Sequence, residues 1–223
     1  MCGGFVLFDD HLTIREHFGL DTAFEINPGY NICPGSMILG VGRLEEKLSS
    51  MLFRWGLIPG WSKSKQTQYK MINARMEGIW HKPSFKSAIR YRRCLIPASG
   101  FYEWKKTASG KQPYFITASD SSILAMAGIW ESWEDKSSGE VILSCSILTT
   151  EAGGVVKDIH DRMPVIIDPS GYTDWLDCRV QSSKDLIIRE KPAEKLTAWP
   201  VRTLVNNPGN NSLDLFRAVD SKR

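Results

Sequence analysis

The sequence predicts an α+β fold, a single domain around a mostly antiparallel, barrel-like β-sheet with peripheral helices. Short segments of alternating apolar and polar residues, rich in β-branched and aromatic side chains, dominate the middle of the chain. Turn clusters with proline and glycine separate these segments, and the fewer helical patterns lie toward the edges. No repeat or linker-like stretch divides the 223 residues, so we expect one domain over residues 1–223.

The same patterns place the individual elements. Strands are expected at Ser36–Val41, Ser50–Leu57, Cys94–Glu103, Tyr114–Thr117, Ile123–Trp130, Val141–Thr149 and Pro164–Ile167. Helices are expected at His11–Phe18, Ser84–Arg92, Tyr172–Leu176 and Ser183–Glu190. Ser182 or Ser183 suits the start of the last helix, because a serine side chain accepts a hydrogen bond from a free backbone N–H there.

Charge and cysteine usage limit the classes of protein. The net charge of +3 identifies no polyanionic partner by itself. No apolar run approaches the roughly 18 residues of a membrane span, and no secretory signal pattern is present. Five scattered cysteines without a C-x-x-C pair argue against a disulfide framework and a structural zinc site. We therefore expect a cytoplasmic protein of bacterial type, with no membrane partner, no metal and, lacking glycine-rich nucleotide motifs, no cofactor.

The position of Cys2 directly after Met1 has chemical consequences. A small side chain at position two normally allows the initiator methionine to be removed, which leaves an α-amine and a thiol on one residue. Their reference pKa values, about 7.7–8.0 and about 8.5, make both partly available near neutral pH. Together they can trap an aldehyde as a Schiff base and then as a thiazolidine ring. Taken alone, a chance cysteine at a frayed terminus is the simpler explanation.

Glu103 and His160 have the chemistry of proton transfer. Glu103 ends a strand-like run between Tyr102 and Trp104, and a carboxylate among aromatic rings is desolvated, which raises its pKa. His160 is bracketed by carboxylates, one of them Asp161, which can orient an imidazole that titrates near neutral pH. An exposed glutamate on a strand edge and a loop histidine with one backbone hydrogen bond are the alternatives, and the residues leave both open.

Other residues suit a nucleic acid. Asn73 and Arg75 are two apart, hence on one face of any strand that carries them, and suit a sugar oxygen and a phosphate. A structural pair bracing a turn is the alternative. Trp61 could stack on an unpaired base, whereas we expect Trp55 in the core. The stretch His81–Arg93 holds five lysine and arginine side chains and no acid, which fits either a phosphate-binding surface or a solvated helix face.

Together these motifs resemble the SRAP (SOS-response-associated peptidase) family of abasic-site processing proteins. The matching motifs occur in the family's order and span most of the chain. They are Met1-Cys2-Gly3, Tyr30-Asn31 with Pro34, Trp55-Gly56-Leu57-Ile58-Pro59-Gly60-Trp61, Asn73-Ala74-Arg75-Met76-Glu77, Cys94-Leu95-Ile96-Pro97, Gly100-Phe101-Tyr102-Glu103-Trp104 and His160-Asp161-Arg162-Met163-Pro164.

The resemblance implies a compact barrel-like domain that crosslinks to abasic sites in single-stranded DNA through its N-terminal cysteine. By resemblance, Cys2 is the nucleophile and Asn73 lies beside it and helps to hold the abasic sugar. Glu103 is expected to transfer protons in sugar-ring opening and in crosslink reversal. His160 is expected to assist the Schiff-base chemistry.

The resemblance also implies that Arg75 and Arg162 grip the flanking phosphates. The chain departs from the family at one place, because the family usually continues Cys-Gly-Arg whereas the fourth residue here is Gly4. The missing arginine leaves the aldehyde chemistry intact but removes an expected contact to the DNA backbone. Arg90 or Arg92 is the expected compensation.

The sequence therefore predicts a monomeric protein that captures abasic sites in single-stranded DNA on Cys2, associates with the nucleoid when DNA is damaged, and has possible crosslink reversal and AP-lyase activity. A thiol peptidase, or autopeptidase, with Cys2 as nucleophile and His160 or the α-amine as base is the alternative. A non-covalent DNA-binding module that uses the basic stretch and tryptophans is a third.

Overall fold

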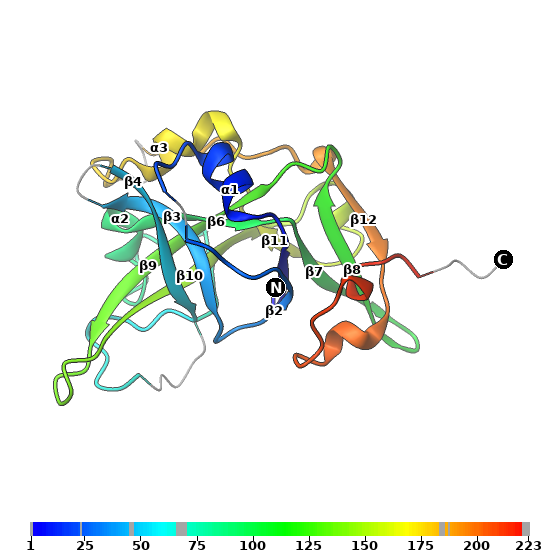
Figure 1. The fold of residues 1–223 in the computed structure, drawn as a ribbon, viewed down its shortest axis with the longest axis horizontal. Helices are drawn as coiled ribbons and strands as arrows, with labels where there is room; N and C mark the ends of the chain where they lie inside the picture. Colours follow the sequence, from blue (N-terminus) through cyan, green and yellow to red (C-terminus); the bar gives the residue numbers. More distant parts are fainter. Residues whose placement is uncertain are drawn as a thin grey trace.

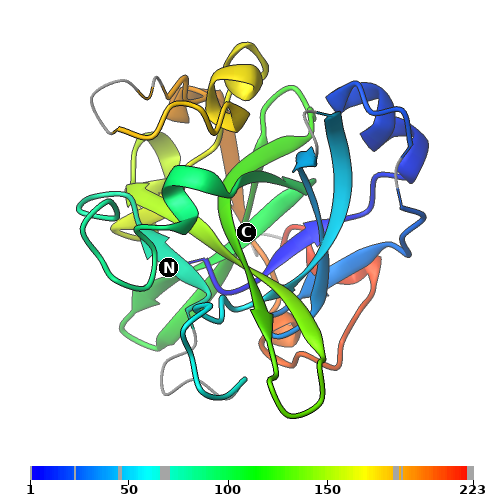
Figure 2. The same ribbon diagram turned by 90° about the vertical axis from the view of Figure 1, so that its left-hand side faces the viewer.

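A closed barrel of five strands forms the centre of the molecule (Figure 1). The computed structural model describes residues 2–22, 24–44, 47–65, 71–182, 186 and 188–219. The barrel strands are β3 (Met37–Leu44), β4 (Lys47–Trp55), β6 (Arg93–Ala98), β9 (Leu124–Glu134) and β10 (Val141–Glu151). The antiparallel pairs are β4–β3, β3–β6, β6–β9 and β9–β10, and β10 closes the ring by pairing in parallel with β4. The β9–β10 hairpin projects beyond the barrel (Figure 2).

A second, fully antiparallel sheet lies beside the barrel. Its strands are, in spatial order, β12 (Leu196–Pro200), β8 (Gly110–Ala118), β7 (Gly100–Thr107), β1 (Phe5–Leu7) and β2 (Gly29–Ile32). The chain leaves the barrel at the end of β6 and enters this sheet at the start of β7, with Ser99 between the two strands. The predicted α+β fold around a mostly antiparallel, barrel-like sheet is therefore confirmed.

The carboxyl end of β10 extends out of the barrel and carries a short strand on each edge. β5 (Asn73–Arg75) pairs in parallel with it on one edge, through Ile147 and Thr149. β11 (Arg162–Pro164) pairs antiparallel on the opposite edge, because Thr149 faces Arg75 on one side and Pro164 on the other. This arrangement brings two polar motifs far apart in the sequence to the same end of one strand.

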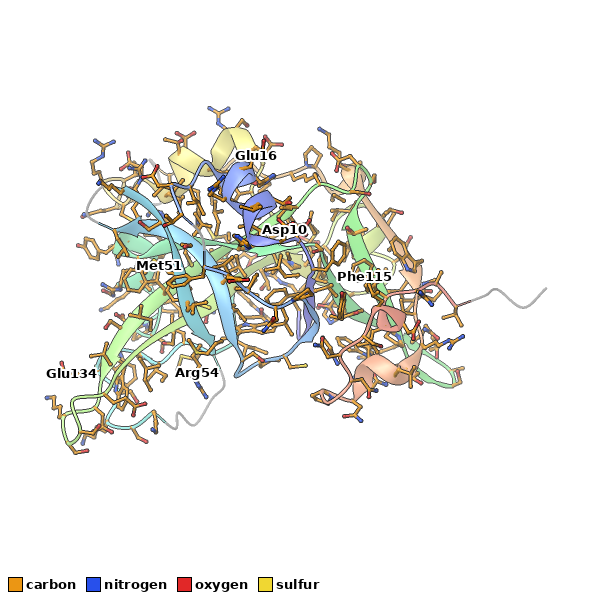
Figure 3. All side chains as sticks on the ribbon, viewed as in Figure 1. Asp10, Glu16, Met51, Arg54, Phe115 and Glu134 are labelled. Atoms are coloured by element: carbon orange, nitrogen blue, oxygen red, sulfur yellow. The ribbon has the colours of Figure 1, made fainter. Side chains whose placement is uncertain are left out.

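Helices are few and peripheral, as predicted. They are α1 (His11–Phe18), α2 (Ala88–Tyr91), α3 (Tyr172–Leu176) and the 3-10 turns η1 (Gly154–Val156), η2 (Pro169–Gly171), η3 (Ala193–Lys195), η4 (Thr203–Asn206) and η5 (Leu213–Leu215). The side chain of Asp10 (Figure 3) caps α1 by accepting a 2.8 Å hydrogen bond from Thr13 N, and Gly19 ends the helix at φ 64°. None of the helices in the described ranges is long and apolar enough to span a bilayer.

The core fills the barrel and continues under β1. Trp55 is fully buried, as predicted, and its indole N–H donates to Ile72 O at 2.9 Å while its ring meets Phe5 edge to face. Arg93 is also buried, and its guanidinium donates to the carbonyl oxygens of Ile89, Trp175, Asp177 and Val180. This side chain thus joins α2, α3 and the loop after α3 to β6, because each carbonyl it satisfies belongs to one of those segments.

Several predicted boundaries were wrong. Cys94–Glu103 is two strands in two sheets and not one strand. The helix predicted over Ser84–Arg92 is reduced to α2, with turns before it. The helix predicted over Ser183–Glu190 begins outside the described residues, and at its end Glu190 forms a β-bridge with Ile167. The strands β1, β2, β5 and β12 were not predicted.

Candidate functional site

Cys2 lies directly before β1, and the thiol is buried with no exposed surface. Burial and, to a smaller extent, the negative charge of Glu103 raise the pKa of the Cys2 thiol to about 12. The Sγ atom lies 3.8 Å from the carbonyl oxygen of Gly4. The thiol is therefore held in its protonated form near neutral pH, close enough to Glu103 for the two groups to influence each other's charge.

Asn73, in β5, contacts the Cys2 backbone. Its Nδ2 donates a 2.7 Å hydrogen bond to Cys2 O. Its Oδ1 is buried and accepts no hydrogen bond within the described part of the chain. The side-chain NH₂ group of Asn73 thus holds the backbone of Cys2, and its side-chain oxygen is available to accept a hydrogen bond.

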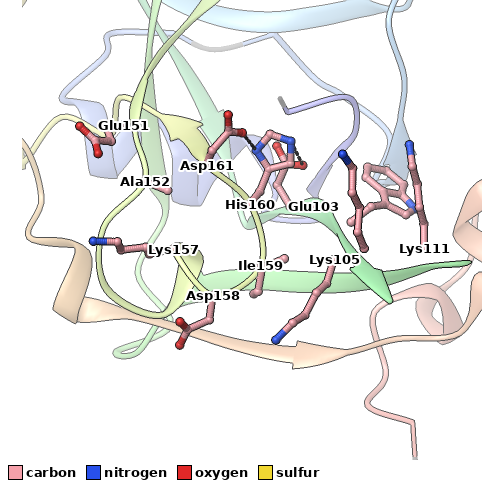
Figure 4. Close-up of a pocket in the computed structure, with 12 residues that line it drawn as sticks. Glu103, Lys105, Lys111, Glu151, Ala152, Lys157, Asp158, Ile159, His160 and Asp161 are labelled. Atoms are coloured by element: carbon pink, nitrogen blue, oxygen red, sulfur yellow. Dashed lines mark ion pairs between the residues drawn. The ribbon is translucent and has the colours of Figure 1, made fainter. Parts of the chain in front are cut away.

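Glu103 and His160 face each other across the site. Glu103 is 1% exposed in β7, and burial raises the pKa of its carboxyl group while the nearby His160 opposes that shift. His160 Nε2 lies 4.0 Å from Glu103 Oε2, as the dashed line in Figure 4 marks. On its other side the ring is held by its own loop, because Nδ1 lies 2.7 Å from Asp161 Oδ1 and 3.0 Å from Arg162 N. The exposed-glutamate alternative for Glu103 is excluded by this burial.

The two arginines of the short strands lie at the same end of β10. Arg75 is exposed in β5, with Asn73 two residues before it in the same strand. Arg162, in β11, forms two parallel hydrogen bonds of 2.8 Å to the carboxylate of Glu77, and a third of 2.6 Å to Thr149 O. Its Nε is buried without a hydrogen-bond partner among the described residues. A guanidinium in this geometry is equally suited to a phosphate.

The remaining predicted DNA contacts lie apart from this group. Trp61 is 69% exposed on the loop after β4. Arg90, in α2, places its guanidinium 5.6 Å above the Trp80 ring. Arg92 forms a 2.7 Å ion pair with Glu131. Both arginines are thus already engaged in contacts within the protein.

A cavity of about 760 Å³ opens beside Glu103 and His160 (Figure 4). Its lining comes from the β7–β8 hairpin on one side and from the loop between β10 and β11 on the other. The lining residues are Glu103, Trp104, Lys105, Lys106, Lys111, Glu151, Ala152, Lys157, Asp158, Ile159, His160 and Asp161. The buried carboxylate and the imidazole are therefore reachable by a ligand of substantial size.

Sequence reasoning missed the contact between Glu77 and Arg162, and the lysines of the cavity. Glu77 stands in a quoted motif, but the residues that face Arg162 depend on the pairing of β5 and β11 with β10. The lysines had a usable signal, because no acidic residue occurs between Trp104 and Ser119. Among the described residues no group of three or more His, Cys, Asp or Glu side chains could hold a metal ion.

Known proteins resemble this chain over most of its length. The family model described as SOS response associated peptidase (SRAP) matches residues 1–208. "Abasic site processing protein YoaM" of Bacillus subtilis (strain 168) is 39% identical, covering 98% of each chain. "Abasic site processing protein HMCES" of Xenopus tropicalis is 32% identical, covering 86% of this chain and 66% of that protein.

Solved structures show the same fold. A protein from Bacteroides thetaiotaomicron superposes with a TM-score of 0.88 at 25% identity, covering 98% of this chain and 100% of that one. A phage-related protein from Bordetella bronchiseptica superposes with a TM-score of 0.73 at 29% identity, covering 90% and 94%. From the family match and these relatives, the chain belongs to the SOS response associated peptidase (SRAP) family.

Proposed function

We propose that this protein processes abasic sites in single-stranded DNA by forming a covalent thiazolidine between Cys2, freed of Met1, and the aldehyde of the abasic sugar. The observation that carries the proposal is the position of Cys2, held by Asn73 at 2.7 Å beside the buried Glu103. The names of the relatives from Bacillus subtilis and Xenopus tropicalis support the same substrate. An abasic nucleotide suits a buried nucleophile because no base blocks the approach to its sugar.

The chemistry needs two bond-forming steps. The free amine of Cys2 attacks C1′ of the ring-opened sugar, and one water leaves as the Schiff base forms. The thiol sulfur then bonds to the same carbon, and the thiol proton passes to the imine nitrogen. The product is a five-membered ring, and the overall reaction loses one water molecule without any oxidant or reductant.

Glu103 is proposed to move the protons. Opening the sugar ring requires a proton on the ring oxygen and removal of one from the C1′ hydroxyl, which a single carboxyl group can do in turn. Burial raises the pKa of Glu103, so its acid form persists to higher pH than that of an ordinary glutamate. The same group lies close enough to the Cys2 thiol to raise its pKa, and so to assist thiol transfer in crosslink formation and reversal.

His160 is proposed to assist the Schiff base. Its Nε2 faces the Glu103 carboxylate, whereas its Nδ1 is held by the loop. An imidazole so placed can take up and return a proton during amine addition and loss of water. A Schiff base at C1′ can also undergo β-elimination, which would give the protein a weak AP-lyase activity.

The DNA backbone is proposed to cross the end of β10. Arg75 is exposed there for one phosphate, and Arg162 presents its guanidinium for another, once the phosphate displaces Glu77. Trp61 is exposed for base stacking, and Arg90 and Arg92 add positive charge farther along. Asn73 Oδ1 is placed to accept a hydrogen bond from a sugar hydroxyl.

A denaturing gel tests the proposal. Mature protein is incubated with an oligonucleotide that carries one abasic site, and we expect a shifted band with the wild type and none with Cys2→Ala. Cys178→Ala removes another free cysteine and is expected to crosslink as the wild type does. A wild-type protein that gives no band, or a band that persists in Cys2→Ala, would contradict the proposal.

The peptidase alternative is tested separately with a general protease substrate. Peptide release that is lost in Cys2→Ser, without any DNA crosslink, would favour it. The buried Cys2 thiol, with its pKa of about 12, has the opposite character to the low-pKa thiolate that thiol proteases use.

A further inference from the structure

We propose that the β7–β8 hairpin is a second nucleic-acid contact, and that Lys105, Lys106 and Lys111 bind the phosphates on one side of the abasic nucleotide. This inference rests on the proposed function, because it adds a flank to the same site. The occupant is the single-stranded DNA that continues beyond the captured sugar. No residue of this hairpin takes part in the proposed crosslinking steps except Glu103, at its base.

The hairpin places like charges opposite each other. Lys106 pairs with Lys111 in the register of β7 and β8, and both side chains are exposed. Like charges directly opposite on an antiparallel pair are destabilising. Within the described ranges, none of the three lysines forms an ion pair with a carboxylate, and no acidic residue occurs between Trp104 and Ser119. An unneutralised pair of this kind is suited to an anionic ligand.

The lysines line the same cavity as the reacting groups. Glu103 and His160 lie at one part of the cavity, and Lys105 and Lys111 lie along the hairpin (Figure 4). Lys106, in the same hairpin, also lines the cavity. The volume of about 760 Å³ lies within the range of about 300–1,000 Å³ typical of ligand sites, and it exceeds what a sugar without a base requires. The cavity therefore has room for more of the strand than the abasic sugar alone.

Charge on the opposite wall directs the strand toward the hairpin. That wall, formed by the end of β10 and the loop between β10 and β11, carries Glu151, Asp158 and Asp161 with a single lysine, Lys157. Phosphates are repelled by these carboxylates and attracted by the hairpin. Trp104 lines the cavity on the hairpin side. Its ring is held in position because its Nε1 donates a 2.8 Å hydrogen bond to Asn206 Oδ1. A fixed indole beside lysines is an arrangement that single-strand binding sites use for stacking.

The β7–β8 hairpin lies on a different side of the site from Arg90 and Arg92, two of the predicted DNA contacts. In Figure 1, β7 and β8 lie on one side of β2, and α2 and β9 lie on the other. Arg90 belongs to α2, and Arg92 pairs with Glu131 of β9. The hairpin is thus placed to serve one flank of the strand and the arginines the other.

The experiment uses the double variant Lys106→Gln/Lys111→Gln and fluorescein-labelled oligothymidylates. In one oligonucleotide the abasic site lies near the 5′ end, in a second near the 3′ end, and in a third at the centre. We expect the variant to bind and crosslink more weakly than wild type when nucleotides extend over the hairpin flank, and equally well when they extend only over the other. Lys47→Gln/Lys136→Gln makes the same charge change away from the cavity, and is expected to match the wild type.

Salt dependence measures the number of phosphates. Each lost contact to a single strand makes the negative slope of log affinity against log salt less steep by about 0.7, so two lost contacts reduce its steepness by about 1.4. Between 50 and 200 mM salt the wild type is then expected to lose about sevenfold more affinity than the hairpin variant. The unfolding midpoint of the variant is measured alongside, and is expected to be unchanged or raised, since a repulsion is removed.

The two proposals fail in different ways. If the wild type forms no covalent product with any oligonucleotide, the proposed function is wrong. If the wild type crosslinks but the hairpin variant shows the same affinity, rate and salt slope on all three oligonucleotides, this inference alone is overturned. A loss that is equal on both flanks, or that the control variant shares, would also overturn it.

Discussion

At the scale of single residues, the ion pair of Glu77 and Arg162 shows how a site can be occupied before its ligand arrives. The Glu77 carboxylate is 57% exposed and takes the two guanidinium positions that a phosphate would use. The bond to Arg162 also lowers the pKa of Glu77, so the carboxylate stays charged at neutral pH. If Arg162 binds a phosphate as proposed, DNA must compete with this side chain for it.

Glu77→Gln is expected to strengthen non-covalent binding of single-stranded DNA. Removing the competing charge frees Arg162 for a phosphate, and we expect about a two- to tenfold lower Kd, with a steeper salt dependence. Fluorescence anisotropy with an oligonucleotide that has no abasic site measures this without the crosslink. Glu16→Gln, on the exposed face of α1, makes the same charge change and controls for net charge. Binding that is weaker than wild type in Glu77→Gln would contradict the competition.

Glu103→Gln is expected to separate stability from activity. Burial raises the pKa of Glu103, so the carboxylate form is less favourable in the folded state than in the unfolded state. The free energy of unfolding of the wild type therefore falls as pH rises through the raised pKa. Glutamine stays neutral, so the variant should unfold at a higher temperature than wild type near pH 8, with the difference shrinking toward about pH 4. Its crosslinking rate should fall by about 10²-fold or more, since the proton carrier is gone. Thermal unfolding that shows the variant less stable near pH 8 would contradict this account.

Much of the site could be predicted from residue type and motif order. Cys2 was recognisable from its place after Met1, and Asn73, Glu103 and His160 from the motifs that carry them. What each side chain contacts was not predictable. Asn73 was expected to lie beside Cys2 and to help hold the sugar; it does lie beside Cys2, through a hydrogen bond to the Cys2 backbone that was not predicted, and the sugar contact stays a prediction. The hydrogen bond joins residues 71 positions apart, which no local pattern encodes.

At the scale of elements, the division between β6 and β7 is the difference that matters most for the site. The apolar run from Cys94 to Glu103 predicts one strand. In the structure both halves of the run are buried, but they belong to different strands. The strand is divided at Ser99, whose N–H donates to Val6 O at 2.7 Å and whose hydroxyl accepts from Phe8 N at 3.0 Å. These bonds to the segment around β1 turn the chain from the barrel into the second sheet, and so set the position of Glu103.

Gly100→Ala is expected to destabilise the protein and to impair crosslinking together. A Cβ at Gly100 would lie 2.3 Å from the Phe115 ring and 2.7 Å from Ile116 O, and a backbone oxygen cannot move away easily. We expect a loss of about 1–3 kcal/mol in the free energy of unfolding, measured in urea. In Gly60→Ala the nearest atom lies at 3.6 Å, so this control should lose far less. Equal stability of the two variants would contradict the close approach of β7 and β8 at Gly100.

At the scale of the whole molecule, the site lies where the barrel meets the second sheet. Glu103 lies in β7 of the second sheet, and Cys2 precedes β1 of that sheet by three residues. Asn73 and Arg162 lie in β5 and β11, which pair with the end of β10. The strand content and the antiparallel character were predictable from alternation. Closure was not, because it depends on β10 pairing with β4 in parallel and with β9 on its other edge.

This architecture makes the chemistry dependent on the first residue of the mature chain. The free amine of Cys2 exists only when Met1 is removed, whereas Asn73 and Glu103 already lie beside Cys2. Covalent capture is therefore expected to depend on whether Met1 has been removed.

The intact mass of the crosslinked product tests this claim most directly. Protein purified from its native source is incubated with an abasic oligonucleotide and no reducing agent, and the adduct is weighed by mass spectrometry. We expect the mass of the chain without Met1 plus that of the oligonucleotide, less one water, with the modification on Cys2 in the digested peptide. An adduct that still contains Met1, or one attached to another residue, would contradict the account.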